Sequence, residues 1–161
     1  MKKQQKGFSL IELLIVVAII LIIAAIAIPN LLRSKMAANE ASAVGSIRTI
    51  NTAEVTYANS YPTVGFGALA VLGGPAASCA GATFAASANA CLIDDVLAQG
   101  TKSGYNFVAT AAGGTPTTTY VSTAIPVTAG TTGQRDFCSD QSGVVRATQA
   151  GTACTNAAPA L

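Results

Sequence analysis

The stretch KGFSLIELLIVVAIILIIAAIAIPN, from Lys6 to Asn30, decides how this chain is organised. Sixteen uninterrupted apolar residues extend from Leu13 to Ile28. As a helix, the run from Phe8 would be about 30 Å long, which is the thickness of a hydrocarbon core. One acid, Glu12, lies near the start of the run. A carboxylate there is costly unless it is paired, so the stretch predicts a membrane-spanning helix in which Glu12 has a special role.

The residues before the run, MKKQQKG, form a short basic segment that ends in Gly7. Its lysines would hold it on the cytoplasmic side of a membrane. Without residues 1–7 the net charge changes from +2 to −1, because six basic and seven acidic side chains remain. No basic patch for nucleic acid is then left. Cleavage after Gly7 would keep the helix as an anchor, whereas cleavage near Ala25–Ala27 would discard it as a secretory signal. We expect the first, since the run continues directly into further helical sequence.

The stretch KGFSLIELLIVVAII resembles the class III signal of type IV pilins and related pilin-like proteins. In this family a dedicated membrane peptidase cuts after the glycine and methylates the new N-terminal phenylalanine. The resemblance implies cleavage after Gly7 and N-methylation of Phe8. The family's acid near the start of the mature helix corresponds to Glu12, and its helix-breaking proline corresponds to Pro29. The chain departs from the family at Leu21, where many members have a glycine.

The resemblance suggests a purpose for Glu12. After cleavage the Phe8 amine is a new cation in the same low-dielectric layer. If subunits stack helically, Glu12 of one copy can pair with the Phe8 amine of the next. This pairing would neutralise both groups and set the axial register of the stack. The alternative is that Glu12 simply lies at the level of the lipid headgroups.

The rest of the chain predicts an α+β head. One helix is expected from about Ser9 to Asn59, with a kink or short melted stretch near Ala24–Pro29 caused by the proline. We interpret the charges of Glu40, Arg48 and Glu54 in its second half as ordinary solvated positions. Residues 62–103 are rich in Gly, Ala and Pro and form a connecting region, with a helical turn within Leu92–Gly100. Four short alternating segments within residues 104–147 predict antiparallel strands.

The expected fold class is therefore the α+β pilin fold, a long N-terminal helix packed on a four-stranded antiparallel sheet, with its hydrophobic half protruding. The expected organisation is a leader at 1–7, a transmembrane and polymerisation segment at 8–30, and a globular head at 31–161. The head comprises the second half of the helix, a connecting loop at 62–103, a sheet at 104–147 and a C-terminal loop at 138–154.

The four cysteines predict two disulfides in an oxidising compartment. They form no C-x-x-C pair, and the chain has no histidine to complete a zinc site. Three pairings are possible. We expect the nearest-neighbour pairing, Cys79–Cys91 and Cys138–Cys154, because it closes short loops. The second loop resembles the disulfide-bounded C-terminal region of type IV pilins.

No catalytic residue, metal site or cofactor is expected. There is no histidine base and no nucleophile elbow, and the glycine-rich VGFGALAVLGG lacks the Gly-Lys-Ser/Thr of a phosphate-binding loop. Asp94 and Asp95 are adjacent, but without further carboxylates nearby they make a poor calcium cage. We interpret them as a helix cap or a solvated pair. The chain is therefore not expected to be an enzyme.

The resemblance implies a structural protein, a type IV pilin held in the inner membrane and polymerised with itself into an extracellular helical filament. It also implies a prepilin peptidase and methyltransferase, an assembly ATPase and an inner-membrane platform as partners. Adhesion, twitching motility and DNA uptake would be activities of the whole fibre. One alternative is a pseudopilin of a type II secretion system, although the calcium-binding acids usual in that group are missing. Another is a membrane-tethered periplasmic binding module that never polymerises and does not need Glu12.

Overall fold

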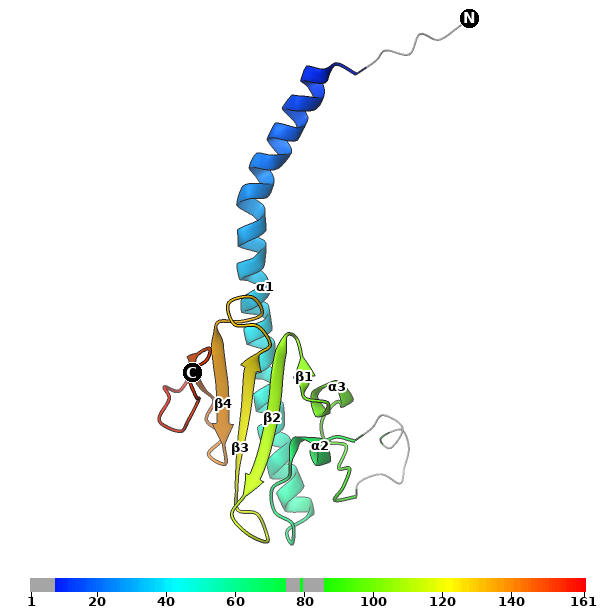
Figure 1. Cartoon of the computed structure of the whole chain (residues 1–161). Helices are drawn as coiled ribbons and strands as arrows, with labels where there is room; N and C mark the ends of the chain where they lie inside the picture. The colour runs from blue at the N-terminus through cyan, green and yellow to red at the C-terminus, as the bar shows by residue number, and fades with distance from the viewer. Residues whose placement is uncertain (1–7, 75–78, 80–85) are drawn as a thin grey trace, which may run out of the picture. The chain divides into compact units, whose positions relative to one another are not determined.

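The computed structural model describes residues 8–74, Cys79 and residues 86–161 of the chain (Figure 1). The chain divides into two compact units, Met1–Lys35 and Met36–Leu161. The predicted leader lies outside the described residues. The unit boundary falls a few residues after the predicted division between the apolar segment and the head.

Helix α1 runs from Leu10 to Ser60, so the predicted helix is confirmed to within one residue at each end. The melted stretch predicted at Ala24–Pro29 is wrong for this subunit, because α1 remains helical through Pro29. A proline removes only one helical hydrogen bond, here the one that the carbonyl of Ala25 would accept. The Ala-, Ile- and Leu-rich turns on both sides keep their own bonds, so the helix continues.

A five-stranded antiparallel sheet packs against the second half of α1 in the Met36–Leu161 unit (Figure 1). The α+β class is therefore confirmed, with one strand more than predicted. The strands follow in the order β1-β2-β3-β4-β5. Their bounds are β1 Thr101–Lys102, β2 Tyr105–Ala112, β3 Thr119–Pro126, β4 Arg135–Asp140 and β5 Arg146–Gln149. Two-residue β1 is too short to show an alternating pattern, so the sequence gives no signal for it.

The core lies between α1 and the sheet. One stripe of α1 is buried, and the side chains that alternate along β2 and β4 face it. Side-chain hydrogen bonds tie the layers together: Asn51 donates to Ser139 at 2.8 Å and accepts from the Tyr120 hydroxyl at 3.1 Å. The main apolar side chains of this core are Ala43, Ile47, Ile50, Ala53, Tyr57, Tyr105, Phe107, Ala109, Ala124 and Phe137.

Two short helices lie in the connecting region. Helix α3, Asp95–Ala98, confirms the helical turn predicted there, whereas α2, Leu69–Leu72, was not predicted. Leu72 and Leu97 are fully buried, so these short helices extend the core at the β1 edge of the sheet.

The C-terminal tail covers the face of β4 that points away from α1. Cys138 is joined to Cys154 of the tail, and Asp136 accepts the Gly151 N–H at 3.0 Å. Both side chains are buried. They alternate along β4 with Phe137, which faces the core. An antiparallel bridge between Arg146 and Ala160 then places the end of the tail beside β5.

Candidate processing and assembly site

The predicted processing site lies at the start of α1. Phe8 is 81% exposed and precedes the helix, which begins at Leu10. Gly7, the other half of the predicted cleavage junction, lies outside the described residues. An exposed residue without helical structure is open to a peptidase, so the geometry at Phe8 is compatible with cleavage before it.

Glu12 caps the helix in which it lies. Its Oε2 accepts the backbone N–H of Ser9 at 3.0 Å. Ser-x-x-Glu is the spacing of a capping box, in which an acid in the first turn satisfies an N–H at the helix start. This intramolecular bond was not predicted, although the spacing was a visible signal for it. The predicted pairing of Glu12 with Phe8 joins two copies of the chain and stays a prediction.

The first unit exposes a continuous apolar surface on α1. The helix has an 18-residue window of mean hydropathy 3.3, none of it buried, and by length and composition it could cross a membrane. Its exposed large apolar side chains up to the unit boundary are Leu10, Ile11, Leu13, Leu14, Ile15, Val16, Val17, Ile19, Ile20, Leu21, Ile22, Ile23, Ile26, Ile28, Leu31 and Leu32. A surface of this size requires an apolar partner, either lipid or other helices.

Both predicted disulfides are present, so the nearest-neighbour pairing is confirmed. Cys79–Cys91 closes the connecting region, and Cys138–Cys154 fastens the tail to β4. The cysteines therefore have a structural task in the head.

The first of the two adjacent acids at the start of α3, Asp94, is a helix cap as predicted, and Asp95 is exposed. Asp94 accepts the Leu97 N–H at 2.9 Å and forms an ion pair with Lys102 at 2.9 Å. Burial raises the pKa of Asp94, but the hydrogen bonds from Lys102 and Leu97 outweigh it and hold the pKa below its usual value. Among the described residues, no three acids, cysteines or histidines gather as a metal site would require.

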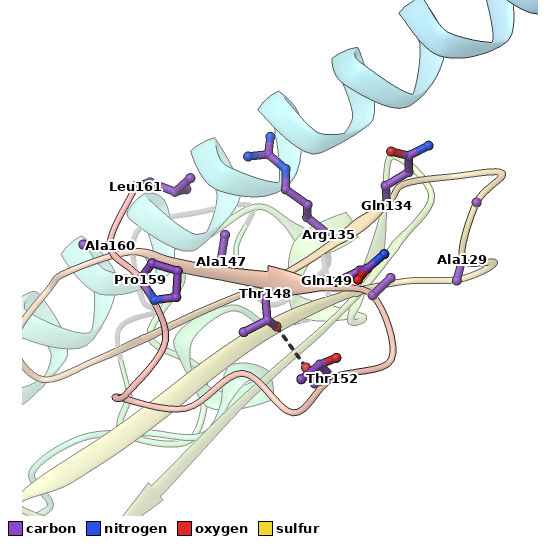
Figure 2. Close-up of a pocket in the computed structure, with 12 residues that line it drawn as sticks. Ala129, Gln134, Arg135, Ala147, Thr148, Gln149, Thr152, Pro159, Ala160 and Leu161 are labelled. Carbon is purple, nitrogen blue, oxygen red and sulfur yellow. Dashed lines mark hydrogen bonds between the residues drawn. The ribbon is translucent and has the colours of Figure 1, made fainter.

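An open groove of about 1100 Å³ lies beside β5, between the β3–β4 loop and the end of the tail (Figure 2). Its charged lining residue is Arg135, and Glu40 of α1 holds this guanidinium through contacts of 2.8 and 2.9 Å. The carboxylate therefore offsets the charge that Arg135 brings to the groove. Much of the remaining lining consists of small apolar side chains, including Ala129, Ala147 and Pro159.

Two acids of α1 were misjudged from the sequence. Glu40 and Glu54 were expected at solvated positions, but they are only 8% and 0% exposed. Glu40 accepts the Gln134 N–H at 2.8 Å as well as Arg135, and Glu54 accepts the Gly67 N–H at 2.9 Å. A signal was present, because both acids fall on the stripe of three- and four-residue steps that the buried residues of α1 follow.

The N-terminal segment matches a known family model. Residues 2–28 match the prokaryotic N-terminal methylation motif. No solved structure matches the chain significantly.

Three characterised proteins are similar to this chain. Type II secretion system core protein G of Aeromonas hydrophila is 35% identical over 80 residues, which is 48% of this chain and 56% of that protein. Type IV wide pilus major component PilA4 of Thermus thermophilus is 60% identical over 38 residues, 24% of this chain and 29% of that protein. Type IV major pilin protein PilA of Myxococcus xanthus is 43% identical over 54 residues, 34% of this chain and 24% of that protein. Each match thus covers less than two thirds of the relative's length.

The methylation motif, the apolar first half of α1 and the α+β head together define a protein of the type IV pilin and pseudopilin class. Members of this family are structural subunits and not enzymes.

Proposed function

We propose that this chain is the structural subunit of a type IV pilus, which polymerises through α1 into a surface filament. The observation that carries the proposal is the exposed apolar surface of α1, most of which lies within the methylation motif at residues 2–28. The printed names of the Thermus and Myxococcus relatives, a wide pilus component and a major pilin, support it.

The apolar surface needs a partner at every stage. Burial of a single Leu or Ile side chain is worth about 1.5–3 kcal/mol, so water strongly disfavours the exposed run as a whole. The inner membrane would cover this surface before assembly, with residues 8–30 as the single span. Helices of neighbouring copies would cover it in the filament.

Processing and stacking would both act at the start of α1. A prepilin peptidase would cut between Gly7 and Phe8 and methylate the new amine. Glu12 uses Oε2 to cap Ser9, and the described residues give Oε1 no hydrogen bond. This second oxygen is available for the Phe8 amine of the next copy, and the pair would neutralise a charge in an apolar layer. An assembly ATPase and a membrane platform would drive the addition of subunits.

A second candidate is a pseudopilin of a type II secretion system. The match to core protein G of Aeromonas favours it, because that match covers more of this chain than the other two. Adhesion, motility and DNA uptake belong only to the pilus proposal, as activities of its assembled fibre.

The test is to shear the cell surface and to measure the intact mass of the protein without reduction. A mass that begins at N-methylated Phe8, lighter by four hydrogens for two disulfides, is expected from the sheared fraction. Processed protein that stays in the membrane fraction would favour the pseudopilin. A mass that begins after Ala27 would contradict both candidates, because the apolar run would then be a discarded signal.

A further inference from the structure

We propose that Glu54 is a proton-operated latch for the α1–α2 loop, residues 61–67. The neutral carboxyl holds the loop closed against α1, and ionisation of the carboxyl favours an open loop. The proposal concerns the head alone and does not depend on whether the chain forms a pilus or a pseudopilus.

The carboxyl group of Glu54 is buried and only half satisfied. The residue has no exposed surface. Its Oε2 accepts the Gly67 N–H at 2.9 Å, whereas Oε1 is buried and has no hydrogen-bond partner among the residues that the structure describes. A buried carboxylate with a single hydrogen bond is costly, and a neutral carboxyl in the same position costs far less. The closed geometry therefore favours the protonated acid.

The neighbouring titratable groups do not neutralise this acid. Tyr57, one turn further along α1, and Tyr120 on β3 both feel the charge of Glu54. The hydroxyl of Tyr57 donates to the carbonyl of Ser87 at 2.6 Å, and that of Tyr120 donates to Asn51. Neither hydroxyl hydrogen is therefore free for Oε1.

Burial raises the pKa of Glu54 from its ordinary value of 4.5 to about 7, and the Gly67 hydrogen bond offsets only part of that rise. Burial also raises the pKa of Tyr57 above its usual value and that of Tyr120 to about 12. Tyr61 adds to the rise at Tyr57, and Asp140 on β4 adds to the rise at Tyr120. Both of the tyrosines that face Glu54 therefore stay protonated near neutral pH, where Glu54 titrates.

Among the described residues, side chains of Glu54 and Thr117 both hydrogen-bond to the loop backbone, and Glu54 is the one that can titrate. Thr117 lies at the end of the β2–β3 hairpin. Its Oγ1 lies 2.9 Å from the carbonyl of Val64 and 2.7 Å from that of Phe66. At the Glu54 anchor the loop backbone packs closely, because a Cβ on Gly67 would lie 2.7 Å from the Val71 side chain. Loss of the Glu54 anchor would free the Gly67 end of the loop while Thr117 still holds its middle.

The sign of the effect follows from the two pKa values. In an open loop Glu54 is solvated and titrates near its ordinary value, so the closed loop binds the proton more tightly. Raising the pH therefore shifts the equilibrium towards the open loop. With pKa values of 4.5 open and about 7 closed, the closed-to-open ratio falls about 30-fold between pH ~5.5 and ~8.5.

Hydrogen exchange of the full chain in detergent micelles tests the latch. Exchange of a peptide that covers residues 61–68 is measured across this pH range and corrected for the intrinsic pH dependence of exchange. We expect the protection of the Gly67 amide to fall about 30-fold, while amides in the middle of β2 keep their protection. Glu54→Gln keeps an oxygen for Gly67 but cannot ionise, so its corrected profile is expected to be flat. Asp95→Asn, which removes an exposed acid, is the matched control and should behave like the wild type.

Two results would overturn the proposal. One is a flat corrected profile in the wild-type protein, and the other is a Glu54→Gln profile as steep as that of the wild type. If Glu54→Gln does not fold, the carboxyl resonance of ¹³C-labelled Glu54 in the wild-type chain decides the question. A titration midpoint near 4.5 would then exclude the latch.

Discussion

At the scale of single residues, Glu12 has one observed task, helix capping, and one proposed task, assembly, and its two oxygens can share them. Oε2 caps the start of its own helix through Ser9. The proposed pairing with Phe8 of a neighbouring copy requires a negative charge as well as a free oxygen. Substitutions at this position can therefore separate capping from assembly.

We predict that Glu12→Gln abolishes filaments. A glutamine at this position still accepts the Ser9 N–H, because capping boxes use Gln as well as Glu. It cannot neutralise an amine in an apolar layer, so stacking should fail while the subunit still enters the membrane. The amount of subunit in sheared and membrane fractions measures this, with Glu12→Ala as the variant that loses both tasks. Filaments of wild-type abundance from Glu12→Gln would show that the charge is dispensable.

Glu54 should also make the global stability of the head depend on pH. Its pKa is raised in the folded protein, so the folded state binds more protons than the unfolded state between pH 4.5 and about 7. The free energy of unfolding should therefore decrease as the pH rises through this window, by up to about 3 kcal/mol, and level off above it.

Chemical denaturation of the detergent-solubilised chain at a series of pH values measures this decrease. Glu54→Gln should remove most of the slope between pH ~5 and ~7. An unchanged slope in that variant would assign the pH dependence to other groups.

Residue-level prediction succeeded where a motif or a spacing constrained the answer. The two disulfides follow from short loop lengths, and both are present. The prediction failed at Glu40 and Glu54, because charged side chains were assumed to be solvated. Their burial depends on partners far along the chain, Gln134 and Arg135 in one case and Gly67 in the other, which local patterns do not reveal.

At the scale of elements, α1 shows what helical periodicity can and cannot predict. Its limits follow from the apolar stripe and from Tyr61-Pro62, which ends it. The melted alternative at Pro29 was wrong, since one missing hydrogen bond does not break a helix whose neighbouring turns are intact. The strands β2 to β5 were predicted from alternation, whereas β1 and α2 are too short for any periodicity to register.

The tail depends on its disulfide. Cys138→Ser together with Cys154→Ser should lower the free energy of unfolding by about 3 kcal/mol, the amount expected for a loop of this length. The same change should speed hydrogen exchange in residues 150–161 more than in β2, because the tail has no regular strand or helix of its own.

Denaturation under oxidising conditions measures the free energy of unfolding, and mass spectrometry measures hydrogen exchange of the tail. The matched control is the pair Cys79→Ser and Cys91→Ser, which opens the connecting region and should leave exchange of the tail unchanged. Equal exchange of the tail with and without Cys138–Cys154 would mean that hydrogen bonds alone hold it.

At the scale of the whole molecule, the two units have different requirements. The first exposes an apolar helix surface and the second has its own core. We therefore predict that residues 36–161, exported to an oxidising compartment, fold alone as a monomer with two disulfides and form no filaments. Light scattering, intact mass and electron microscopy measure these three properties.

The full-length chain in detergent is the control for that truncation. If residues 36–161 form filaments, the main assembly surface lies on the head and not on α1. A truncated chain that exports but cannot form its disulfides would instead show that α1 up to Lys35 is required for folding.

The class of the molecule could be predicted from the sequence, but the choice between a pilus subunit and a pseudopilin could not. Residues 2–28 carry the motif that the class shares, so they do not distinguish a pilus subunit from a secretion-system subunit. A pilus component and a secretion protein are both among the relatives.

The two edge strands of the sheet, β1 and β5, affect how crowded copies of the chain can associate. β1 has only two residues, and the bridge from Ala160 to Arg146 covers part of β5. Bare strand edges are the usual starting point for amyloid-like growth. Because the edge strand at one border is very short and the other border is partly covered, copies crowded side by side gain little by joining strand to strand. Contacts between crowded copies can then stay reversible, and a chain that polymerises as proposed avoids a second, irreversible kind of polymer.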